Sequence, residues 1–454
     1  MSLNISRNDK KRVVIVGGGF AGIKLARTLD TRYYQVILTD KNNYHQFPPL
    51  IYQIATAGLN PSSISFPIRK LFEGKKDLHF RMAEFRSVSP QENMIQTSIG
   101  KIDYDYLIFA HGTKTNYFGN QRIQEAAIPM KTVSDSMGLR NSLLACFERS
   151  VTCSTREERD ALLNIVVVGG GPSGVEIAGA IAEMKNYILP QDYPDMDTNI
   201  VKITLIQGTE RLLPAMSEKA SAKAKAFLEK MGVQIRLNTL VTDYVDSSAV
   251  LNDGTTIPTR NLIWVGGVAA ENVPGLPKEC FGRGGRLITD GFCKVKNQEN
   301  IFAVGDISLM ENTDPGFPQG HPQMAQPAIQ EGKLLAQNLN RLARGKKCKS
   351  FRYHDLGSMA TIGKNKAVAD LGHLKFAGFF AWVLWMSVHL VSILGVKNKI
   401  LVFIDWIWSY FTYDKSNRMI LKSFKSQSFK DLENYAKNNH LGEDNEVTAL
   451  NKKN

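Results

Sequence analysis

A glycine-rich turn near the N-terminus has the residue types and spacing needed to hold the phosphates of a dinucleotide. Four consecutive β-branched residues run into Gly17, Gly19 and Gly22, and an apolar helical pattern follows. Such glycines permit a tight turn, a close approach of backbone to a pyrophosphate and close packing of helix on strand, while the helix N-terminus offers free N–H groups. The next strand, residues 35–39, ends in Asp40, whose carboxylate can accept hydrogen bonds from a ribose diol. Other α/β proteins also contain glycine turns, but the flanking strand, helix and acid favour a dinucleotide site.

The same pattern recurs later in the chain. An apolar strand runs into Gly169, Gly171 and Gly174, and a helical pattern with Glu176 near its start follows. At the ribose position, after the partner strand, stands the neutral Gln207. Two such units imply two adenine-dinucleotide ligands on one chain. We therefore expect FAD, which carries the flavin, next to a nicotinamide dinucleotide. Gln207 can bond a ribose hydroxyl without repelling a 2′-phosphate, so we expect NADPH as a possible substrate beside NADH.

A third signal is a short apolar stretch that ends in Gly305 and Asp306. In flavoproteins with two dinucleotide-binding domains, which this chain resembles, such an aspartate binds the ribityl and pyrophosphate part of FAD. The resemblance implies that the FAD-binding domain is split in the sequence, with the nicotinamide domain inserted. Where these flavoproteins usually have Ala-Thr-Gly, this chain has Ala110, His111 and Gly112. We expect a structural role for that histidine.

Three further segments resemble the type II NADH:quinone oxidoreductases, the single-subunit respiratory NADH dehydrogenases that do not pump protons. Residues 322–332 resemble their A-Q-x-A-x-Q-x-G segment, residues 45–52 their H-x-F-x-P-L-x-Y loop, and residues 355–363 their G-x-x-A-x-x-G strand. The resemblance covers residues 12–418, and its first segment is the most specific, because other members of the superfamily lack it. It implies FAD-dependent transfer of two electrons from NADH to a membrane quinone.

The resemblance also implies candidate site residues. Gln326 and Gln330 would lie near the flavin ring and the quinone head group, although they could also belong to an ordinary polar helix N-terminus. Glu176 would lie between the nicotinamide and quinone regions as a candidate proton conduit. We take these three as candidate catalytic residues and expect no metal. The backbone near Ala325 is well placed to stabilise the negative charge of a reduced flavin. The candidate cofactor-binding residues are Gly17, Gly19, Phe20, Ala21, Gly22, Asp40, Lys41, Pro49, Ala110, Gly112, Asp306, Ala325, Gln326, Gly169, Gly171, Ser173, Gly174, Gln207 and Gly266.

The expected fold is α/β, with two Rossmann-type dinucleotide-binding domains, the second inserted in the first, and a C-terminal helical region that docks on a membrane. The predicted parts are an FAD-binding domain at residues 1–116 and 296–354, an NAD(P)H-binding domain at 117–295, a membrane-anchoring region at 355–425 and a mobile tail at 426–454.

Two stretches of the first domain invite more local predictions. Residues 78–88, 93–99 and 104–110 are predicted as strands of a small sheet that returns to this domain. Residues 43–52 are predicted not to be helical through their proline pair. Considered alone, this segment is a rigid surface loop, although a flat apolar ligand could lie against it.

Composition narrows the possible partners. The 454 residues are 43% hydrophobic, enough for two or three domains with cores. A formal charge of +13 suits nucleic acid or an anionic membrane surface. The chain has no zinc-finger spacing and no basic helix suited to a DNA groove, so we expect no nucleic acid. The polar N-terminus has no apolar core of a signal peptide, and the five scattered cysteines indicate a reducing compartment.

The C-terminal region has the pattern of a membrane-docking surface. Residues 376–394 are almost wholly apolar and residues 400–411 form a second, aromatic run, with lysines between and after them. The first run, of 19 residues, is borderline for a bilayer core about 30 Å thick. Two helices lying in the interface of an anionic membrane are expected; a buried core helix and one true span remain as alternatives. We expect a peripheral protein on the cytoplasmic side of the cell inner membrane, and a homodimer.

Other flavoprotein functions remain as alternatives. A sulfide:quinone oxidoreductase needs cysteines around the flavin, and Cys153 and Cys348 are available, but Cys348 lies in a basic loop. The second glycine turn also argues for a real nicotinamide site. A disulfide reductase is disfavoured because no C-x-x-x-x-C follows the first helix. A flavin-binding redox-sensing protein with slow turnover would be separated from an enzyme by a quinone reductase assay.

Overall fold

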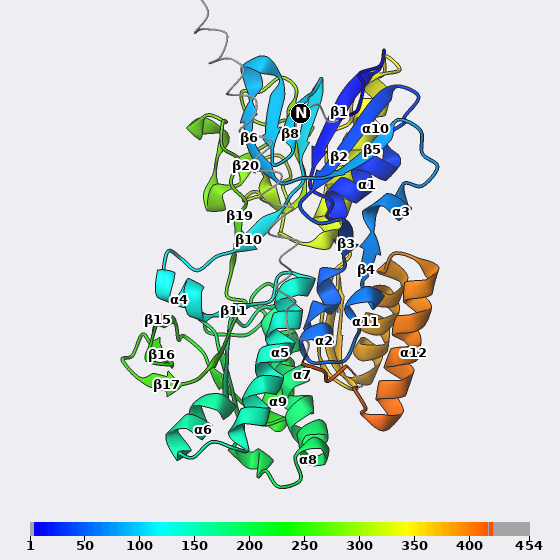
Figure 1. The fold of residues 1–454 in the computed structure, drawn as a ribbon. Helices are drawn as coiled ribbons and strands as arrows, with labels where there is room; N and C mark the ends of the chain where they lie inside the picture. Colours follow the sequence, from blue (N-terminus) through cyan, green and yellow to red (C-terminus); the bar gives the residue numbers. More distant parts are fainter. Residues whose placement is uncertain (1–3, 416, 421–454) are drawn as a thin grey trace, which may run out of the picture. The chain divides into compact units, whose positions relative to one another are not determined.

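The first parallel sheet forms around the strand that precedes the first glycine turn. The structure, a computed structural model, describes residues 4–415 and 417–420. All strands of this sheet are parallel to their neighbours, in the order β21-β9-β1-β2-β5 (Figure 1). Its strands are β1 (Lys11–Val16), β2 (Tyr34–Asp40), β5 (Leu78–Met82), β9 (Tyr106–Phe109) and β21 (Ile301–Ala303). Because β21 comes from far along the chain, it completes the sheet in the way that a split FAD-binding domain predicts.

Both faces of this sheet are covered, which explains why β1 is buried at every position after its first residue. Alternate residues of β1 point to opposite faces. On one face they pack with α1 (Phe20–Thr28) and α10 (Ala325–Leu342), and on the other with a three-stranded antiparallel sheet. The strands of that small sheet are β6 (Phe85–Ser89), β7 (Met94–Thr97) and β8 (Gly100–Asp103).

Two strand predictions in this region are wrong in part. The stretch 78–88 is not one strand, because β5 ends at Met82 and β6 begins at Phe85. The predicted strand at 104–110 joins the first sheet as β9, beside β1, rather than the small sheet. Alternating apolar residues indicate strands, but they do not say which sheet a strand joins.

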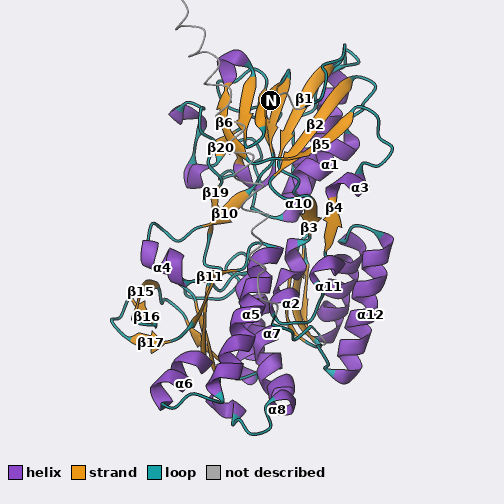
Figure 2. Cartoon of the chain, viewed as in Figure 1, coloured by secondary structure: helices purple, strands orange, loops and turns teal. Residues whose placement is uncertain are grey.

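The second parallel sheet repeats this plan around the second glycine turn, in the order β11-β18-β12-β13-β14. Its strands are β11 (Ile128–Pro129), β12 (Asn164–Val168), β13 (Lys202–Ile206), β14 (Val233–Arg236) and β18 (Asn261–Trp264). The helices of this part are α4 (Gln121–Ala126), α5 (Val133–Ser150), α6 (Arg156–Leu163), α7 (Pro172–Glu183), α8 (Leu189–Asp192) and α9 (Glu218–Lys230). Figure 2 shows the first strand of this sheet, β11, near helices α5 and α7. The described part of the chain therefore contains two dinucleotide-type sheets.

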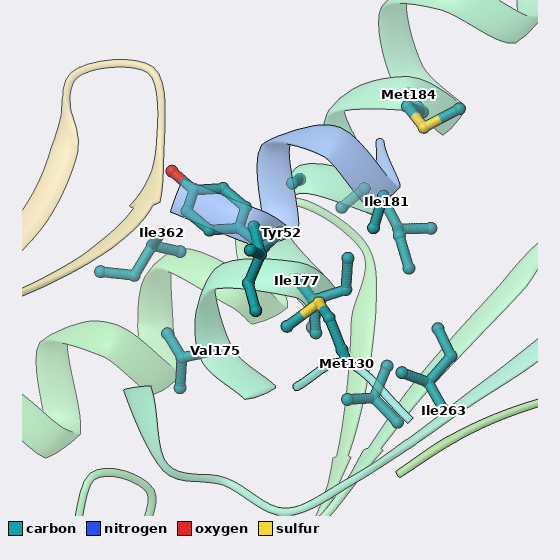
Figure 3. Packing of buried hydrophobic residues seen from close by; sticks show 14 of the residues in the cluster. Tyr52, Met130, Val175, Ile177, Ile181, Met184, Ile263 and Ile362 are labelled. Carbon is teal, nitrogen blue, oxygen red and sulfur yellow. The ribbon is translucent and has the colours of Figure 1, made fainter. Parts of the chain in front are cut away.

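One hydrophobic core ties the second sheet to the C-terminal region (Figure 3). It joins Ile177 of α7, Ile263 of β18 and Tyr52 of a short helix, α2 (Ile51–Ala55). Gly179 of α7 packs so closely on the C-terminal sheet that a Cβ there would clash with the carbonyl oxygen of Ile362. The helix that follows the second glycine turn is thus fixed from both sides. The remaining short elements are β3 (Tyr44–Gln46), β4 (Ser65–Pro67), α3 (Ile68–Leu71), β10 (Thr113–Thr115), β15 (Val241–Val245), β16 (Ser248–Leu251), β17 (Thr256–Pro258), β19 (Val268–Ala270), β20 (Leu287–Ile288) and β22 (Ser308–Leu309).

The prediction of a non-helical surface loop at 43–52 is wrong. Pro48 and Pro49 open a 3₁₀ turn that continues directly into α2. Proline is tolerated there because the first residues of a helix have no partner for their N–H groups. Leu50 and Ile51 are buried, so this segment is part of the core.

The C-terminal region is an antiparallel sheet followed by two helices. Its elements are β23 (Ser358–Gly363), β24 (Lys366–Leu371), β25 (Leu374–Ala377), α11 (Phe379–Ser392) and α12 (Val396–Thr412). The apolar run 376–394 is therefore not one helix, because its first residues end β25 and Gly378 turns the chain. Within the described ranges, no helix has the length and apolar character needed to cross a bilayer. The predicted mobile tail, 426–454, lies outside the described residues.

Candidate functional site

The first glycine turn has the shape of a phosphate-binding loop. Gly17 has φ +109°, a conformation that favours glycine, and a Cβ on Gly22 would clash with the Gly17 carbonyl oxygen. Gly19 differs, because the nearest atom to a Cβ there would be the Ala110 carbonyl oxygen at 3.9 Å. Space therefore remains in front of the Gly19 backbone for a pyrophosphate.

Asp40 stands at the carboxyl end of β2, beside this turn. Its Oδ2 accepts a hydrogen bond from the Gly18 N–H at 2.6 Å, and its Oδ1 accepts one from the Asn42 N–H at 2.7 Å. Burial raises the pKa of Asp40, although these two bonds act in the opposite direction. The next residue, Lys41, pairs with Glu271 at 3.5 Å between Nζ and Oε1. The first glycine turn and Asp40 therefore form one continuous site.

The second glycine turn repeats the first in detail. Gly169 has φ +111°, and a Cβ on Gly174 would clash with the Gly169 carbonyl oxygen. Gly171 would have no neighbour within 4 Å of an added Cβ, so the space before it is free as well. Gly266 follows β18, which lies beside β12 in the sheet, and packs against the turn: a Cβ on Gly169 would lie 2.7 Å from the Gly266 Cα.

Gln207 takes the position that Asp40 has in the first unit. Its Oε1 accepts a hydrogen bond from the Gly170 N–H at 2.6 Å, and its Nε2 donates to Thr209 Oγ1 at 2.6 Å. Nearby in sequence, Arg211 donates from Nη2 to the Pro214 carbonyl oxygen at 2.9 Å, while its buried Nη1 has no partner within the described residues.

Asp306 lies near a half-buried lysine, Lys131, that was not among the residues expected from the sequence. The Thr113 hydroxyl lies 3.4 Å from Asp306 Oδ2, and Lys131 Nζ donates to the same hydroxyl at 2.7 Å. Burial raises the pKa of Asp306 and lowers that of Lys131, while their mutual attraction opposes both shifts. Lys131 lies between β11 and α5, where no motif marks it.

The Ala110–Gly112 segment passes beside the first turn. Its histidine, His111, packs against the rings of Phe85 and Phe109 at 5.7 and 5.5 Å between centroids. Burial lowers the pKa of His111 to about 4, so its ring is neutral near pH 7. This environment fits the structural role predicted for it.

One cleft of about 790 Å³ reaches both units: Gly171 of the second glycine turn lines it, and so does Phe20, the residue after Gly19 of the first turn. The candidate residues that line it are Phe20, Pro49, Gly171, Ser173, Glu176, Ala325 and Gln326. The other candidates lie outside its lining, among them Gly17, Gly19, Gly22, Asp40, Gln207, Asp306 and Gln330. His45 and Tyr52 also line it, in the segment 43–52 against which a flat apolar ligand was considered possible. Other wall residues were not among the candidates, for example Met130, Ile329, Met359 and His389. A flat ring system could lie between these walls.

Three helices begin at this cleft without a side-chain cap. They are α1 after Gly19, α7 after Gly171 and α10 after Met324, and none has an acidic residue in its first turn. By contrast, α5 and α9 are capped by Thr132 and Ser217. Uncapped N-termini leave N–H groups and a partial positive charge for anionic ligands. The two glycine turns and α10 therefore suit two pyrophosphates and an electron-rich ring.

The two candidate glutamines of α10 bond the segment before β23. Gln326 Nε2 donates to the Gly357 carbonyl oxygen at 3.1 Å, and its Oε1 accepts from the Leu356 N–H at 3.2 Å. Gln330 bonds both backbone groups of His354, at 2.9 and 3.0 Å. Gln326 lines the cleft, whereas the amide of Gln330 is occupied by His354.

Glu176 lies where the cleft meets a second, smaller cavity of about 110 Å³. It is 9% exposed, and burial raises its pKa to about 8. The smaller cavity also contains Glu183, Lys364 and Lys415 in its wall. A carboxyl group that holds a proton at neutral pH thus contacts both spaces.

The C-terminal helices have an inner and an outer apolar face. Trp385 and Trp406 are buried, and the indole of Trp406 donates to Gln53 Oε1 at 2.8 Å. On the outer face, large side chains of α11 and α12 are exposed, for example Phe380 at 77% and Phe411 at 78%.

Comparisons with known proteins agree with this geometry. A model of the pyridine nucleotide-disulphide oxidoreductases matches residues 11–332, and a model of the NDH2 C-terminal domain matches residues 355–412. The chain belongs to the pyridine nucleotide-disulphide oxidoreductase family. Within it, the chain is a type II NADH:quinone oxidoreductase by relationship: it is 33% identical to the type II NADH:quinone oxidoreductase NdhA of Mycobacterium tuberculosis, over 87% of this chain and 86% of that protein.

Solved structures share the fold. NDH2 from Plasmodium falciparum, determined with NADH, superposes with a TM-score of 0.84 at 23% identity and covers 91% of this chain and 100% of its own. The sulfide:quinone oxidoreductase of Aquifex aeolicus superposes with a TM-score of 0.67 at 17% identity, covering 92% and 95%. The predicted α/β fold with a C-terminal region is confirmed.

The sulfide:quinone alternative is not favoured. The cleft wall contains no cysteine among the residues that the structure describes. Cys153 and Cys348 bond backbone carbonyl oxygens, those of Ser150 and Asn338, instead. Both are free thiols.

Proposed function

We propose that this protein oxidises NADH and reduces a membrane quinone through bound FAD, without pumping protons. The observation that carries this is one cleft at which three uncapped helices begin, two of them directly after the glycine turns. When bound, FAD supplies the exchange of a hydride with NADH and of two electrons with a quinone. The chain itself binds, orients and shields the reactants.

The residues fit these cofactors. Gly19 and the α1 N-terminus would hold the FAD pyrophosphate, Asp40 its adenosine ribose, and Asp306 its ribityl chain. Gly171 and the α7 N-terminus would hold the NADH pyrophosphate. The α10 N-terminus would place partial positive charge beside the flavin ring, where negative charge develops on reduction.

Glu176 would supply a proton to the reduced quinone. Because burial raises its pKa to about 8, its carboxyl group carries a proton at neutral pH. It lines the cleft, where it could donate, and the smaller cavity, from which it could be reprotonated. General acids positioned in this way accelerate reactions by about 10²–10⁴-fold.

The direct test is the reaction itself. Purified protein should be yellow, release FAD on denaturation and reduce a soluble quinone with NADH. Colourless protein that cannot be reconstituted with FAD, or bound FAD that NADH reduces but quinone does not reoxidise, would contradict the proposal. The second outcome would favour the redox-sensing alternative.

We also propose that the outer face of α11 and α12 docks on an anionic membrane, as a peripheral protein on the cytoplasmic side of the inner membrane. Exposed aromatic residues beside Lys397 and Lys399 suit the interface of such a membrane. The homodimer expected for this protein is also part of the proposal, and light scattering would measure it.

Exposed and internal apolar residues separate membrane docking from folding. Phe380→Ser with Phe411→Ser should move the protein from sedimenting anionic vesicles to the supernatant, because each side chain is more than three-quarters exposed. Val151→Ser, which removes an exposed apolar side chain elsewhere, should leave vesicle binding unchanged. Equal binding by the double variant and the control would contradict docking through these helices.

A further inference from the structure

A buried cluster of ionisable groups lies near the N-terminal end of α10, the end that begins at the cleft. His321 precedes that helix, Glu331 belongs to it, and Asp314 follows β22; the three are 3, 2 and 6% exposed. His321 Nε2 lies 3.3 Å from Asp314 Oδ2, and its Nδ1 lies 3.6 Å from Glu331 Oε1. None of the three lines the cleft. These three residues are therefore not part of the cleft wall described above.

The arrangement favours a protonated imidazole. A neutral ring has one N–H, so one of its nitrogens would present a lone pair to a carboxylate, whereas the imidazolium donates to both. Burial lowers the pKa of His321, but the pairing with Glu331 and Asp314 outweighs burial and leaves this pKa above its usual value. Asp314 is held in turn by the Tyr353 and Gly316 N–H groups, at 3.0 and 3.1 Å.

Other ionisable groups face this cluster from neighbouring elements. Arg286 donates to the carbonyl oxygens of Ser308 and His321. The ring of Tyr353 lies 5.6 Å from that of His321. Burial raises the pKa of the Cys293 thiol, and nearby Glu331 adds to this effect, so the thiol is neutral. The two carboxylates therefore face two cations.

The cluster is bonded directly to the loop that carries Asp306. Glu331 Oε2 accepts a hydrogen bond from the Gly305 N–H at 2.6 Å. Gln323 Nε2 donates to the Asp306 carbonyl oxygen at 3.0 Å, and Gln323 lines the cleft two residues after His321. The same ion pairs thus connect the Asp306 loop and the α10 N-terminus, the two segments that would contact the flavin.

We propose that His321 is a positioning residue for FAD: held between Asp314 and Glu331, it fixes the Asp306 loop against the start of α10. This inference rests on the proposed binding of FAD at this site. We call the two ion pairs of His321, with Asp314 and with Glu331, the clamp. It fixes the positions of these segments rather than stabilising the fold, because buried ion pairs often contribute little to the free energy of unfolding. The ordered loop would bind FAD more tightly, and the aligned helix would favour the reduced flavin, whose ring carries more negative charge.

The sign of the pH dependence follows from the raised pKa. The clamp is lost as pH rises through the higher pKa of folded His321, so it is complete just below the usual histidine pKa of 6.5. It is lost again at lower pH, because burial raises the pKa of Glu331 and this carboxylate then takes up a proton. FAD affinity of the wild type should therefore fall as pH rises through the pKa of His321.

The test compares His321→Gln, which cannot be charged, with His373→Gln, which changes an exposed histidine outside the cluster. FAD affinity of the apoprotein is measured by flavin fluorescence from pH 5.5 to 9, and the midpoint potential of bound flavin by spectroelectrochemistry. At pH 6, His321→Gln should bind FAD about tenfold more weakly, and its affinity should not change across the interval where the wild type weakens. If reduced flavin loses about tenfold more affinity than oxidised flavin, the two-electron potential falls by about 30 mV. His373→Gln should follow the wild type.

Glu331→Gln provides a second variant, since its amide oxygen can still accept the Gly305 N–H bond while the charge that pairs with His321 is removed. It should shift the wild-type pH interval to lower pH and lower the midpoint potential. The inference would be overturned if both variants kept the FAD affinity and midpoint potential of the wild type. It would also be overturned if they lost affinity equally at every pH and kept the wild-type potential. Either result would leave the proposed function intact. Wild-type protein that binds no FAD would overturn both.

Discussion

The two dinucleotide-binding units of this protein have nearly the same backbone and differ in charge. In each, the first glycine has a positive φ and the last glycine packs on its carbonyl group. In each, a side chain at the end of the next strand accepts a hydrogen bond at 2.6 Å from the glycine that follows the first one: Asp40 accepts from Gly18, and Gln207 accepts from Gly170. The backbone therefore offers the same kind of phosphate site twice, and we propose that single residues such as Asp40 and Gln207 decide which dinucleotide fits each.

A second difference lies two residues after the last glycine of each turn. The first unit has Lys24 there and the second has Glu176, and both line the same cleft. Lys24 is half-buried, whereas Glu176 is buried. One scaffold thus presents an ammonium group on one side of the cleft and a protonated carboxyl group on the other.

The largest expected effect comes from exchanging the last glycine of either turn. Gly22→Ala should abolish FAD binding, and Gly174→Ala should leave FAD bound but lower kcat/KM for NADH by up to about 100-fold, because each Cβ would meet a carbonyl oxygen and overpacking costs up to about 3 kcal/mol. Gly138→Ala, in α5 with free space around it, is the control. Loss of FAD in Gly174→Ala would show that the two units do not act separately.

Glu176→Gln should have the next largest effect, on one half-reaction. Flavin reoxidation by quinone should slow by about 10²-fold or more, whereas flavin reduction by NADH should stay within about twofold of the wild type, since hydride transfer needs no proton donor. In the wild type, reoxidation should fall as pH rises through about 8, where the raised pKa lets Glu176 lose its proton, and this limb should vanish in the variant. Stopped-flow traces of both half-reactions, with the exposed Glu125→Gln as control, measure this. If reoxidation of Glu176→Gln still fell as pH rises through about 8, the pH dependence would belong to another group.

The features that repeat were predictable from the sequence. Both glycine turns, the strands before them and the positions of Asp40 and Gln207 follow from local rules on turns, helix starts and apolar runs. The strand predicted before Asp306 is present as β21 in the first sheet, but it ends at Ala303, and Asp306 lies in the 3₁₀ turn Gly305–Ile307 that follows. These predictions depend on neighbours in sequence, and a single sequence contains that information.

The features that depend on distant contacts were not predictable. Nothing local marks Lys131 as the partner of the Thr113 hydroxyl beside Asp306, since they meet only when α5 packs next to the first unit. The Pro48–Pro49 pair was misjudged because burial of Leu50 and Ile51 turns a stiff loop into a helix start. Residues 376–394 were read as one apolar run because hydropathy does not register the strand that ends before Gly378.

A smaller change tests the charge difference between the units directly. Gln207→Glu keeps the acceptor for the Gly170 N–H and adds a negative charge where a 2′-phosphate would lie. Like charges in contact cost several kcal/mol, so kcat/KM for NADPH relative to NADH should fall about tenfold to 100-fold. Gln234→Glu, exposed on the neighbouring strand, controls for added charge. A wild type that already rejects NADPH, or an unchanged ratio in the variant, would show that another residue reads the second ribose, with Arg211 the next to test.

The smallest expected effect concerns α10, the helix start that belongs to the first unit and has no counterpart in the second. Gln326 lines the cleft while Gln330 bonds only the His354 backbone, so the two leucine variants should differ. Gln326→Leu should slow flavin reoxidation by quinone about tenfold and leave reduction by NADH unchanged. Gln330→Leu should lower Tm by about 2 °C, through the loss of two hydrogen bonds worth about 1 kcal/mol each, with both half-reactions nearly unaffected. Equal losses in both half-reactions of Gln326→Leu would mean that this residue holds the flavin itself, and that α10 serves FAD binding rather than the quinone.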